Sequence, residues 1–246
     1  KEAIYTYKKW LNQLTNTGHL DILSIGSSQL TQEAFNEDWS GKENGGGIPL
    51  QTPLDFIDIK ENCGNLLVRA YSGTKSVRSY ATMLDYTIDA TWHALSLWWF
   101  NKSDGRGPLS VSDCLIQHLD TLKYLAEVGK PFEPNISHHF SFRGADDLTS
   151  IVAVYLAVNT AYRLGIRKVV LQCMLNTPKA TSGTEDIVKF RTLLNLLNPL
   201  RQKGLKILFQ PRAGLSYFSP DINKAKAQLA AVSYLMCDIK SNNHPF

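Results

Sequence analysis

The sequence has few cysteines and no pattern that would use them together. Only four occur among the 246 residues, and no two of them form a CxxC pair. A disulfide framework or a zinc site needs more closely spaced cysteines, so neither is indicated. Isolated thiols are typical of a reducing compartment, and we therefore predict a cytoplasmic location.

Long apolar runs and clusters of one charge are also missing. No run approaches the roughly 20 apolar residues that cross a bilayer, and no secretory leader opens the chain. The 26 Lys and Arg residues against 22 Asp and Glu give a net charge of +4, scattered along the chain. We therefore expect neither a membrane nor a nucleic acid as partner. The chain begins at Lys1 without a Met, and we expect it to be a piece of a longer polypeptide.

Several familiar catalytic motifs are absent. The chain has no GxSxG, no HExxH and no close pair of acids on one predicted strand. The triple glycine Gly45–Gly47 lies in neither a GxGxxG nor a Walker pattern; it suits close backbone approach to a flat ligand, or equally a flexible turn. Neighbouring His138 and His139 would point to opposite faces of a strand, so we predict no metal site and at most a histidine that bonds substrate.

What the chain does have is a regular alternation of short apolar runs and longer amphipathic segments. Strands are predicted at 21–27, 48–51, 66–71, 94–100, 132–142, 168–175, 205–211 and 231–239. Helices are predicted at 3–14, 30–39, 75–91, 110–128, 147–164, 185–203 and 221–229. About eight strands, most followed by a helix, are typical of a (β/α)8 TIM barrel, so we predict one α/β barrel domain over residues 1–246. A doubly wound open sheet is the alternative.

The active site of such a barrel lies at the carboxyl ends of its strands. Arg212 follows the predicted strand 205–211, and its forked guanidinium suits a carboxylate or phosphate, with a surface ion pair as the plainer alternative. Arg69, Arg78 and Arg143 are weaker candidates for binding a carboxylate or phosphate. Either a hydrophobic core or the wall of a large planar cofactor would account for Trp92, Trp98, Trp99 and Phe100.

Several stretches resemble one known family. They are Glu43–Ile48 with its triple glycine, Ile136–Phe140 with its two histidines, Lys168–Val170, Asn176–Pro178 and Gln210–Gly214. Together they look like the epsilon chain of glutamate mutase (methylaspartate mutase), an adenosylcobalamin-dependent isomerase built on a TIM barrel. In that family the Pro-Arg-Ala-Gly motif lies on the first strand, whereas here it comes last. The resemblance therefore implies a circularly permuted barrel.

The resemblance also implies a carbon-skeleton mutase with a radical mechanism. The barrel would cover the upper face of the corrin, and the cofactor would supply the radical chemistry. The residues expected to bind adenosylcobalamin are Asn44, Gly45, Gly46, Gly47, Gln172 and Asn176. The residues expected to bind the substrate are Arg212, Arg69 and His139. No residue is assigned a catalytic role.

Departures from the family pattern restrict the expected substrate and partners. Asn44 replaces an acid, Leu50 replaces a tyrosine, and Ser24 or Ile25 stands where an arginine is expected. The residues that grip a dicarboxylic amino acid are thus largely missing, and we expect only a small carboxylic acid. The chain also lacks an Asp-x-His-x-x-Gly motif, so the resemblance implies a Rossmann-like cobalamin-binding module as partner.

Two other functions stay open at this point. One is a cofactor-independent barrel lyase or aldolase, for which Lys102 and Lys168 are the candidate lysines. The other is a non-catalytic barrel subunit of a cobalamin enzyme that has lost its substrate-gripping residues.

Overall fold

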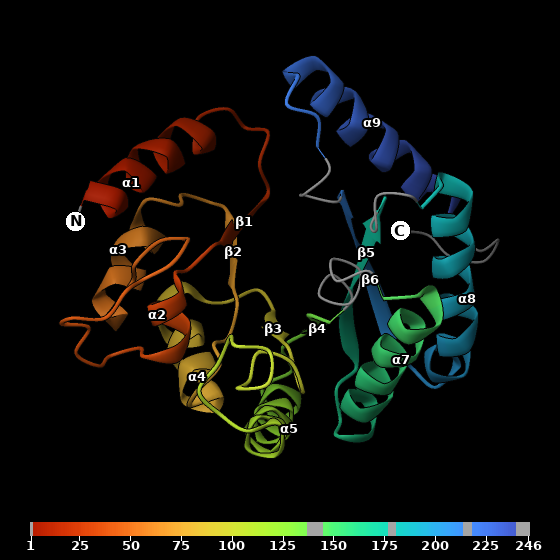
Figure 1. Cartoon of the computed structure of the whole chain (residues 1–246), viewed down its shortest axis with the longest axis horizontal. Helices are drawn as coiled ribbons and strands as arrows, with labels where there is room; N and C mark the ends of the chain where they lie inside the picture. Colours follow the sequence, from red (N-terminus) through yellow and green to blue (C-terminus); the bar gives the residue numbers. More distant parts are fainter. Residues whose placement is uncertain (1, 137–144, 177–180, 214–217, 240–246) are drawn as a thin grey trace. The chain divides into compact units, whose positions relative to one another are not determined.

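The computed structural model describes residues 2–136, 145–176, 181–213 and 218–239, and Figure 1 shows the whole chain. The described residues form a mixed α/β protein with parallel strands and eight helices. The chain divides into two compact units, Lys1–Pro131 and Phe132–Phe246. None of the described helices is both long and apolar enough to cross a membrane. The predicted α/β class is confirmed, while the eight-stranded barrel stays a prediction, because the described strands form no closed ring.

The first unit is built on short parallel strands. It begins with α1 (Glu2–Thr15), and β1 (Ile22–Ile25) pairs in parallel with β2 (Leu67–Ala70). Single parallel bridges join Ser27 to Ile48, and Tyr71 to Ala94 in β3 (His93–Leu95). The other helices of this unit are α2 (Gln29–Glu33), α3 (Pro53–Glu61), α4 (Val77–Ile88) and α5 (Val111–Glu127).

The core of the first unit lies between β1, β2 and the helices. One continuous cluster of buried side chains includes Leu11, Ile25, Phe56, Val68 and Leu84. Burying such side chains is the main favourable contribution to folding, at roughly 25 cal/mol per Å² of apolar surface. The cluster therefore fixes the strands whose carboxyl ends carry the candidate site of this unit.

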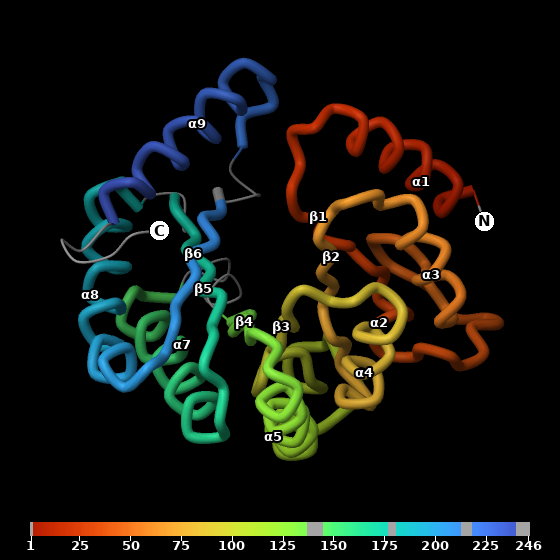
Figure 2. The backbone as a smooth tube through the Cα atoms, turned by 180° about the vertical axis from the view of Figure 1, so that it is seen from behind, coloured from red at the N-terminus to blue at the C-terminus, as the bar shows by residue number. Residues whose placement is uncertain are grey.

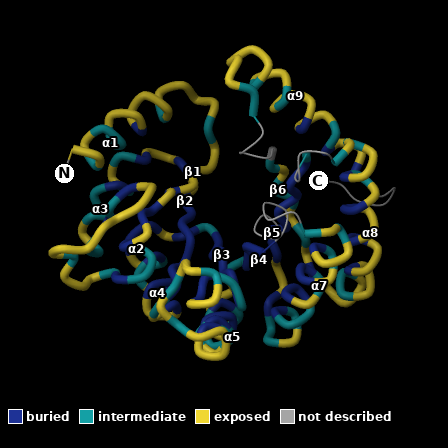
Figure 3. The backbone as a smooth tube through the Cα atoms, viewed as in Figure 1, coloured by how far each residue is buried: buried dark blue, intermediate teal, exposed yellow. Residues whose placement is uncertain are grey.

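The second unit is a run of strand and helix pairs. Its strands β4 (Phe132–Pro134), β5 (Lys168–Leu175) and β6 (Lys206–Ala213) are parallel and adjacent in that order. They are followed in turn by α7 (Asp147–Arg163), α8 (Gly183–Gln202) and α9 (Ile222–Asp238). These three helices lie on one side of β5 and β6, as Figure 1 and the view from behind in Figure 2 show. All of β5 except its first residue is buried (Figure 3).

Four predicted strands were wrong in extent or kind. The predicted strand 132–142 ends at Pro134, and its positions 137–142 lie outside the described residues. The segment 231–239, predicted as the last strand, mostly belongs to the second half of α9, whose buried Val232 and Met236 recur at helical spacing. The predicted strand 94–100 ends at Leu95, because Leu97 and Phe100 have positive φ angles of 55° and 61°. The predicted strand 48–51 is a single bridge at Ile48. Six named strands therefore occur in the described residues, where about eight were predicted.

One helix was not predicted at all. α3 begins at Pro53, whose fixed φ and missing N–H suit the first helical position. The Asp55 carboxylate accepts a hydrogen bond from the Thr52 N–H at 2.7 Å and so completes the start of the helix.

Candidate functional site

Alternate residues of β5 face two different surroundings. The Cys173 thiol lies close to Asp186 and Lys189 of α8, and its pKa is raised by burial. Since side chains alternate along a strand, Gln172 points to the opposite side of the sheet, away from α8. We call that side of β4, β5 and β6 the helix-free face.

The helix-free face carries a polar row across three strands. The Gln172 side chain donates a hydrogen bond to the carboxylate of Glu133 on β4, and both side chains are buried. The parallel register places Gln210 beside Gln172, and Arg212 beside Met174. A carboxylate, two carboxamides and a guanidinium therefore lie on neighbouring strands.

One atom of this row is positioned to accept a further hydrogen bond. The Gln210 Oε1 atom is buried and accepts no hydrogen bond from the rest of the described chain. A buried acceptor without a donor is destabilising, so a water molecule or a polar ligand that donates to this atom would stabilise the site. The half-buried Arg212 lies inside β6, two residues nearer its carboxyl end than Gln210, and not beyond the strand as predicted.

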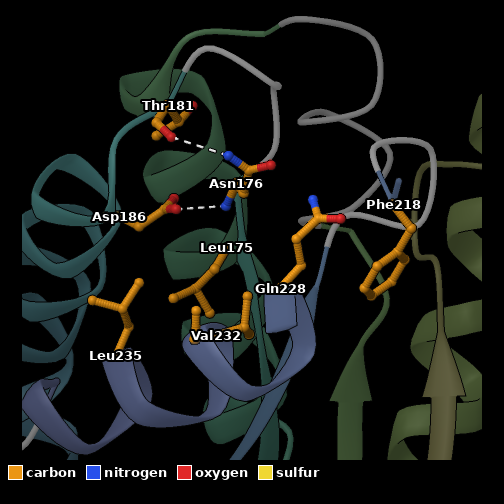
Figure 4. Close-up of a pocket in the computed structure, with 10 residues that line it drawn as sticks. Leu175, Asn176, Thr181, Asp186, Phe218, Gln228, Val232 and Leu235 are labelled. Atoms are coloured by element: carbon orange, nitrogen blue, oxygen red, sulfur yellow. Dashed lines mark hydrogen bonds between the residues drawn. The ribbon is translucent and has the colours of Figure 1, made fainter. Parts of the chain in front are cut away.

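The carboxyl end of β5 is held by a buried charge pair. Asn176 directly follows β5, and its N–H donates to the Asp186 carboxylate at 2.5 Å (Figure 4). Its side-chain amide donates to the Thr181 carbonyl oxygen at 3.4 Å. Burial raises the pKa of Asp186, although the Asn176 N–H and the Lys189 ammonium, 3.0 Å away, act in the opposite direction. The predicted site residue Asn176 is thus fixed in place at the carboxyl end of a parallel strand.

In the first unit, the glycine loop 45–47 packs on the carboxyl end of β1. The Ile48 N–H donates to the Gly26 carbonyl at 2.8 Å. Gly47 has φ +72°, and a Cβ there would lie 2.5 Å from the Gly26 oxygen. The chain itself therefore requires a glycine at this position. Gly46 differs, because it is exposed and nothing lies within 4 Å of the position its Cβ would take.

The side chain of Asn44 is committed to local structure. Its Oδ1 accepts a hydrogen bond from the Leu30 N–H at 3.0 Å, at the start of α2. The Gln29 N–H donates to the Gly45 carbonyl at 3.0 Å. Both bonds satisfy N–H groups in the first turn of a helix, which have no partner within the helix itself. Asn44 therefore anchors the glycine loop, whether or not a ligand rests on it.

The remaining predicted residues are less informative. Arg69 is buried on β2, and its guanidinium lies 5.9 Å from the centre of the Trp92 ring. Arg78 is exposed and pairs with Asp120 at 3.0 Å. Phe100 and Trp92 are buried, while Trp98 and Trp99 are half-buried. The positions that lie outside the described residues are His138, His139 and Arg143.

A hydrogen-bonded chain in the first unit was missed by sequence analysis. Ser72 bonds to His93 Nδ1 at 3.1 Å, and His93 Nε2 lies 2.9 Å from Asp85. Tyr124 donates to the second Asp85 oxygen at 2.8 Å. Burial alone would raise the pKa of Asp85, but its contacts with His93, Tyr124 and Lys130 lower it overall. These residues are far apart in sequence, and no motif spacing signals them.

The order Ser–His–Asp is that of nucleophilic catalysis, but the geometry does not support that chemistry here. The Ser72 and His93 side chains have no exposed surface, and both are held by partners within the protein. The Ser72 N–H donates to Ala94 on β3, and the carboxylate belongs to α4. The chain of bonds therefore ties the ends of β2 and β3 to α4.

No protein-family model and no curated protein matches the chain. The functional argument therefore depends on the site itself. Among the described side chains, no group of three or more His, Cys, Asp or Glu is arranged to hold a metal ion. The candidate lysines of a lyase or aldolase, Lys102 and Lys168, are both exposed, and Lys168 lies at the amino end of β5.

Proposed function

We propose that the chain is the substrate-binding barrel of an adenosylcobalamin-dependent carbon-skeleton mutase that acts on a small carboxylic acid. In this proposal the two units are parts of one circularly permuted (β/α)8 barrel, and a Rossmann-like cobalamin-binding module is the partner. The proposal depends on the resemblance of the sequence motifs and on one structural observation. That observation is the polar row Gln172, Gln210 and Arg212 on the face of a parallel sheet that points away from its own helices.

Arg212 is the residue that best suits the substrate. A guanidinium binds a carboxylate through two parallel hydrogen bonds, which fixes orientation as well as charge. The neighbouring Gln210 Oε1 is a buried acceptor for a hydroxyl or amino group on the same molecule. Glu133 holds the Gln172 amide, so the position of this side chain is set before a substrate arrives.

The exposed backbone of Gly45 and Gly46 fits the cofactor. Both residues are exposed. The Gln29 side chain lies beside Gly45, but the space beside Gly46 is open, so a flat ring can lie against its peptide group. When bound, adenosylcobalamin supplies the radical that removes hydrogen from the substrate. Gln172, Gln210 and Arg212 exchange no proton near neutral pH, so they can hold a substrate without competing acid–base chemistry.

The test measures radical formation in the assembled protein. The purified chain is mixed with adenosylcobalamin and a cobalamin-binding module, and succinate, glutarate and glutamate are added in turn. We expect a cob(II)alamin signal in electron paramagnetic resonance with at least one acid, and its loss in Arg212→Gln. The control is Arg78→Gln, which removes an exposed guanidinium from a surface pair and should leave the signal unchanged. Failure of the chain to associate with adenosylcobalamin, with or without the module, would overturn the proposal.

A further inference from the structure

A cavity of about 190 Å³ lies on the other side of β5 from the polar row. It is lined by the end of β5, the start of α8, the residue Phe218 and the face of α9 that packs on them (Figure 4). Leu175 belongs to the side of β5 that faces the helices, as Cys173 does. The cavity is therefore separate from the helix-free face, although Asn176 borders it.

The walls of the cavity are mainly apolar. Its apolar lining includes Leu175, Phe218, Val232 and Leu235, and Figure 4 shows Leu235 and Val232 extending from α9 towards it. Gly183 helps to set the shape, because a Cβ there would lie 3.0 Å from the Leu235 Cδ1 atom. The first turn of α8 therefore comes close to α9 without filling the space between them.

The polar groups of the lining already have hydrogen-bond partners within the protein. Asp186 accepts the Asn176 N–H and pairs with Lys189 at 3.0 Å. The Gln228 Oε1 atom accepts the Ser219 N–H at 2.8 Å. Because the one charged group in the lining has its counter-ion, the cavity offers no uncompensated charge to a ligand. A ligand with a charge would lose its hydration without gaining an ionic partner.

The size of the cavity defines the size of the ligand. An apolar protein cavity of roughly 150 Å³ stays dry and binds benzene. The present cavity is somewhat larger and has hydrogen-bonding groups in its lining, which suits a single or fused aromatic ring with one polar atom. We propose that the α8–α9 cavity is a binding site for a small, uncharged aromatic molecule between phenol and indole in size. This inference is independent of the proposed mutase function, since Arg212 and Gln210 lie on the opposite face.

The experiment uses phenol and indole as probes, with benzoate and benzylamine as charged probes of similar size. Titration calorimetry should show phenol or indole binding to the wild-type chain with a dissociation constant of about 1 mM or lower. Ala231→Leu places extra carbon atoms in the cavity and should raise that constant about tenfold. Ala230→Leu is the matched control, because Ala230 is exposed on the same helix and does not line the cavity.

Three outcomes would overturn the inference. They are the absence of phenol and indole binding at millimolar concentration, equal effects of the two leucine variants, and tighter binding of benzoate or benzylamine than of the uncharged rings. If Ala231→Leu fails to fold, the methyl resonances of Val232 and Leu235 in the wild-type protein provide a second readout. Phenol should shift them, and shifts confined to other residues would contradict the assignment. None of these results bears on the radical signal that tests the mutase proposal.

Discussion

Asp186 accepts a hydrogen bond from the N–H of Asn176 at 2.5 Å, and this bond fixes the residue at which the chain leaves β5. Asn176 has φ 53°, a left-handed conformation that is unfavourable for most residues other than glycine. The second Asp186 oxygen lies 3.0 Å from Lys189, whose side chain is only 3% exposed. A buried charge pair therefore sets the geometry at the border between the polar row and the α8–α9 cavity.

Replacing Asp186 by Asn should destabilise the fold strongly. The substitution keeps the size of the side chain but removes the buried partner of Lys189, which would keep only the more exposed Asp147 at 3.1 Å. Removing one partner of a buried ion pair lowers the free energy of unfolding by about 3 kcal/mol. Urea unfolding at neutral pH measures this loss. Glu185→Gln, at an exposed capping position one residue earlier, should cost much less, and equal losses would contradict the role given to Asp186.

The Glu133–Gln172 bond should show strong coupling in a double-mutant cycle. Gln172→Leu leaves the buried Glu133 carboxylate without this donor, which we expect to lower the free energy of unfolding by about 2 kcal/mol. Glu133→Leu leaves the Gln172 amide without its acceptor in the same way. The double variant removes both polar groups and should lose less than the sum of the single losses. Strict additivity in urea unfolding would show that the two side chains act independently.

Sequence patterns were sufficient where a segment carries a continuous signal. The strand Lys168–Leu175 was predicted at its observed bounds, because eight residues of mostly apolar character end at a polar Asn. The same pattern placed Gln172 on β5 and Asn176 at the carboxyl end of β5. The pattern of the next strand placed Arg212 one residue beyond that strand, whereas Arg212 lies inside β6. These positions follow from alternation within one element, which needs no knowledge of the rest of the fold.

Other features depend on contacts that no local pattern contains. The strand predicted at 231–239 contains Val232 and Tyr234, which favour strands, but its buried residues continue the helical spacing of α9 and it packs as a helix. That error also hid the α8–α9 cavity, since Val232 and Leu235 line it from a helix face. The triple glycine was ambiguous for a different reason. A glycine is required both where the backbone lies close to a ligand and where it packs closely on the end of β1. Gly47 is a glycine for the second reason.

Burial of His118 should make stability depend on pH. Its side chain is fully buried, and this burial lowers its pKa to about 3. An unfolded histidine has a pKa of about 6.5. Below that pH the unfolded chain therefore binds a proton at this residue, and the folded chain does not. The stability contributed by the neutral imidazole is complete above pH 6.5 and falls progressively as the pH drops towards 3. At pH 4.5, two units below, the loss is roughly 2 to 3 kcal/mol.

The measurement compares urea unfolding at pH 7 and pH 4.5 for the wild type and for His118→Leu. The variant should be less stable at pH 7, because it loses its contact with Ser96, but its loss on acidification should be smaller by about 2 kcal/mol. His19→Gln is the control, since His19 is exposed and its removal should leave the pH difference unchanged. An unchanged pH difference in His118→Leu would mean that other groups cause the acid loss.

The neighbouring glycines Gly46 and Gly47 should respond differently to alanine. At Gly47 the new methyl group would lie within 2.7 Å of three backbone atoms of residues 26 and 27, so the pairing with β1 must shift. We expect a loss of about 3 kcal/mol in the free energy of unfolding. At Gly46 the space is open, and only the cost of φ +42° remains, about 1 kcal/mol. Gly46→Ala therefore keeps the fold and isolates the proposed contact with adenosylcobalamin. Its dissociation constant for the cofactor should rise if the loop lies against the ring, and an unchanged constant in this folded variant would remove the glycine loop from the cofactor site.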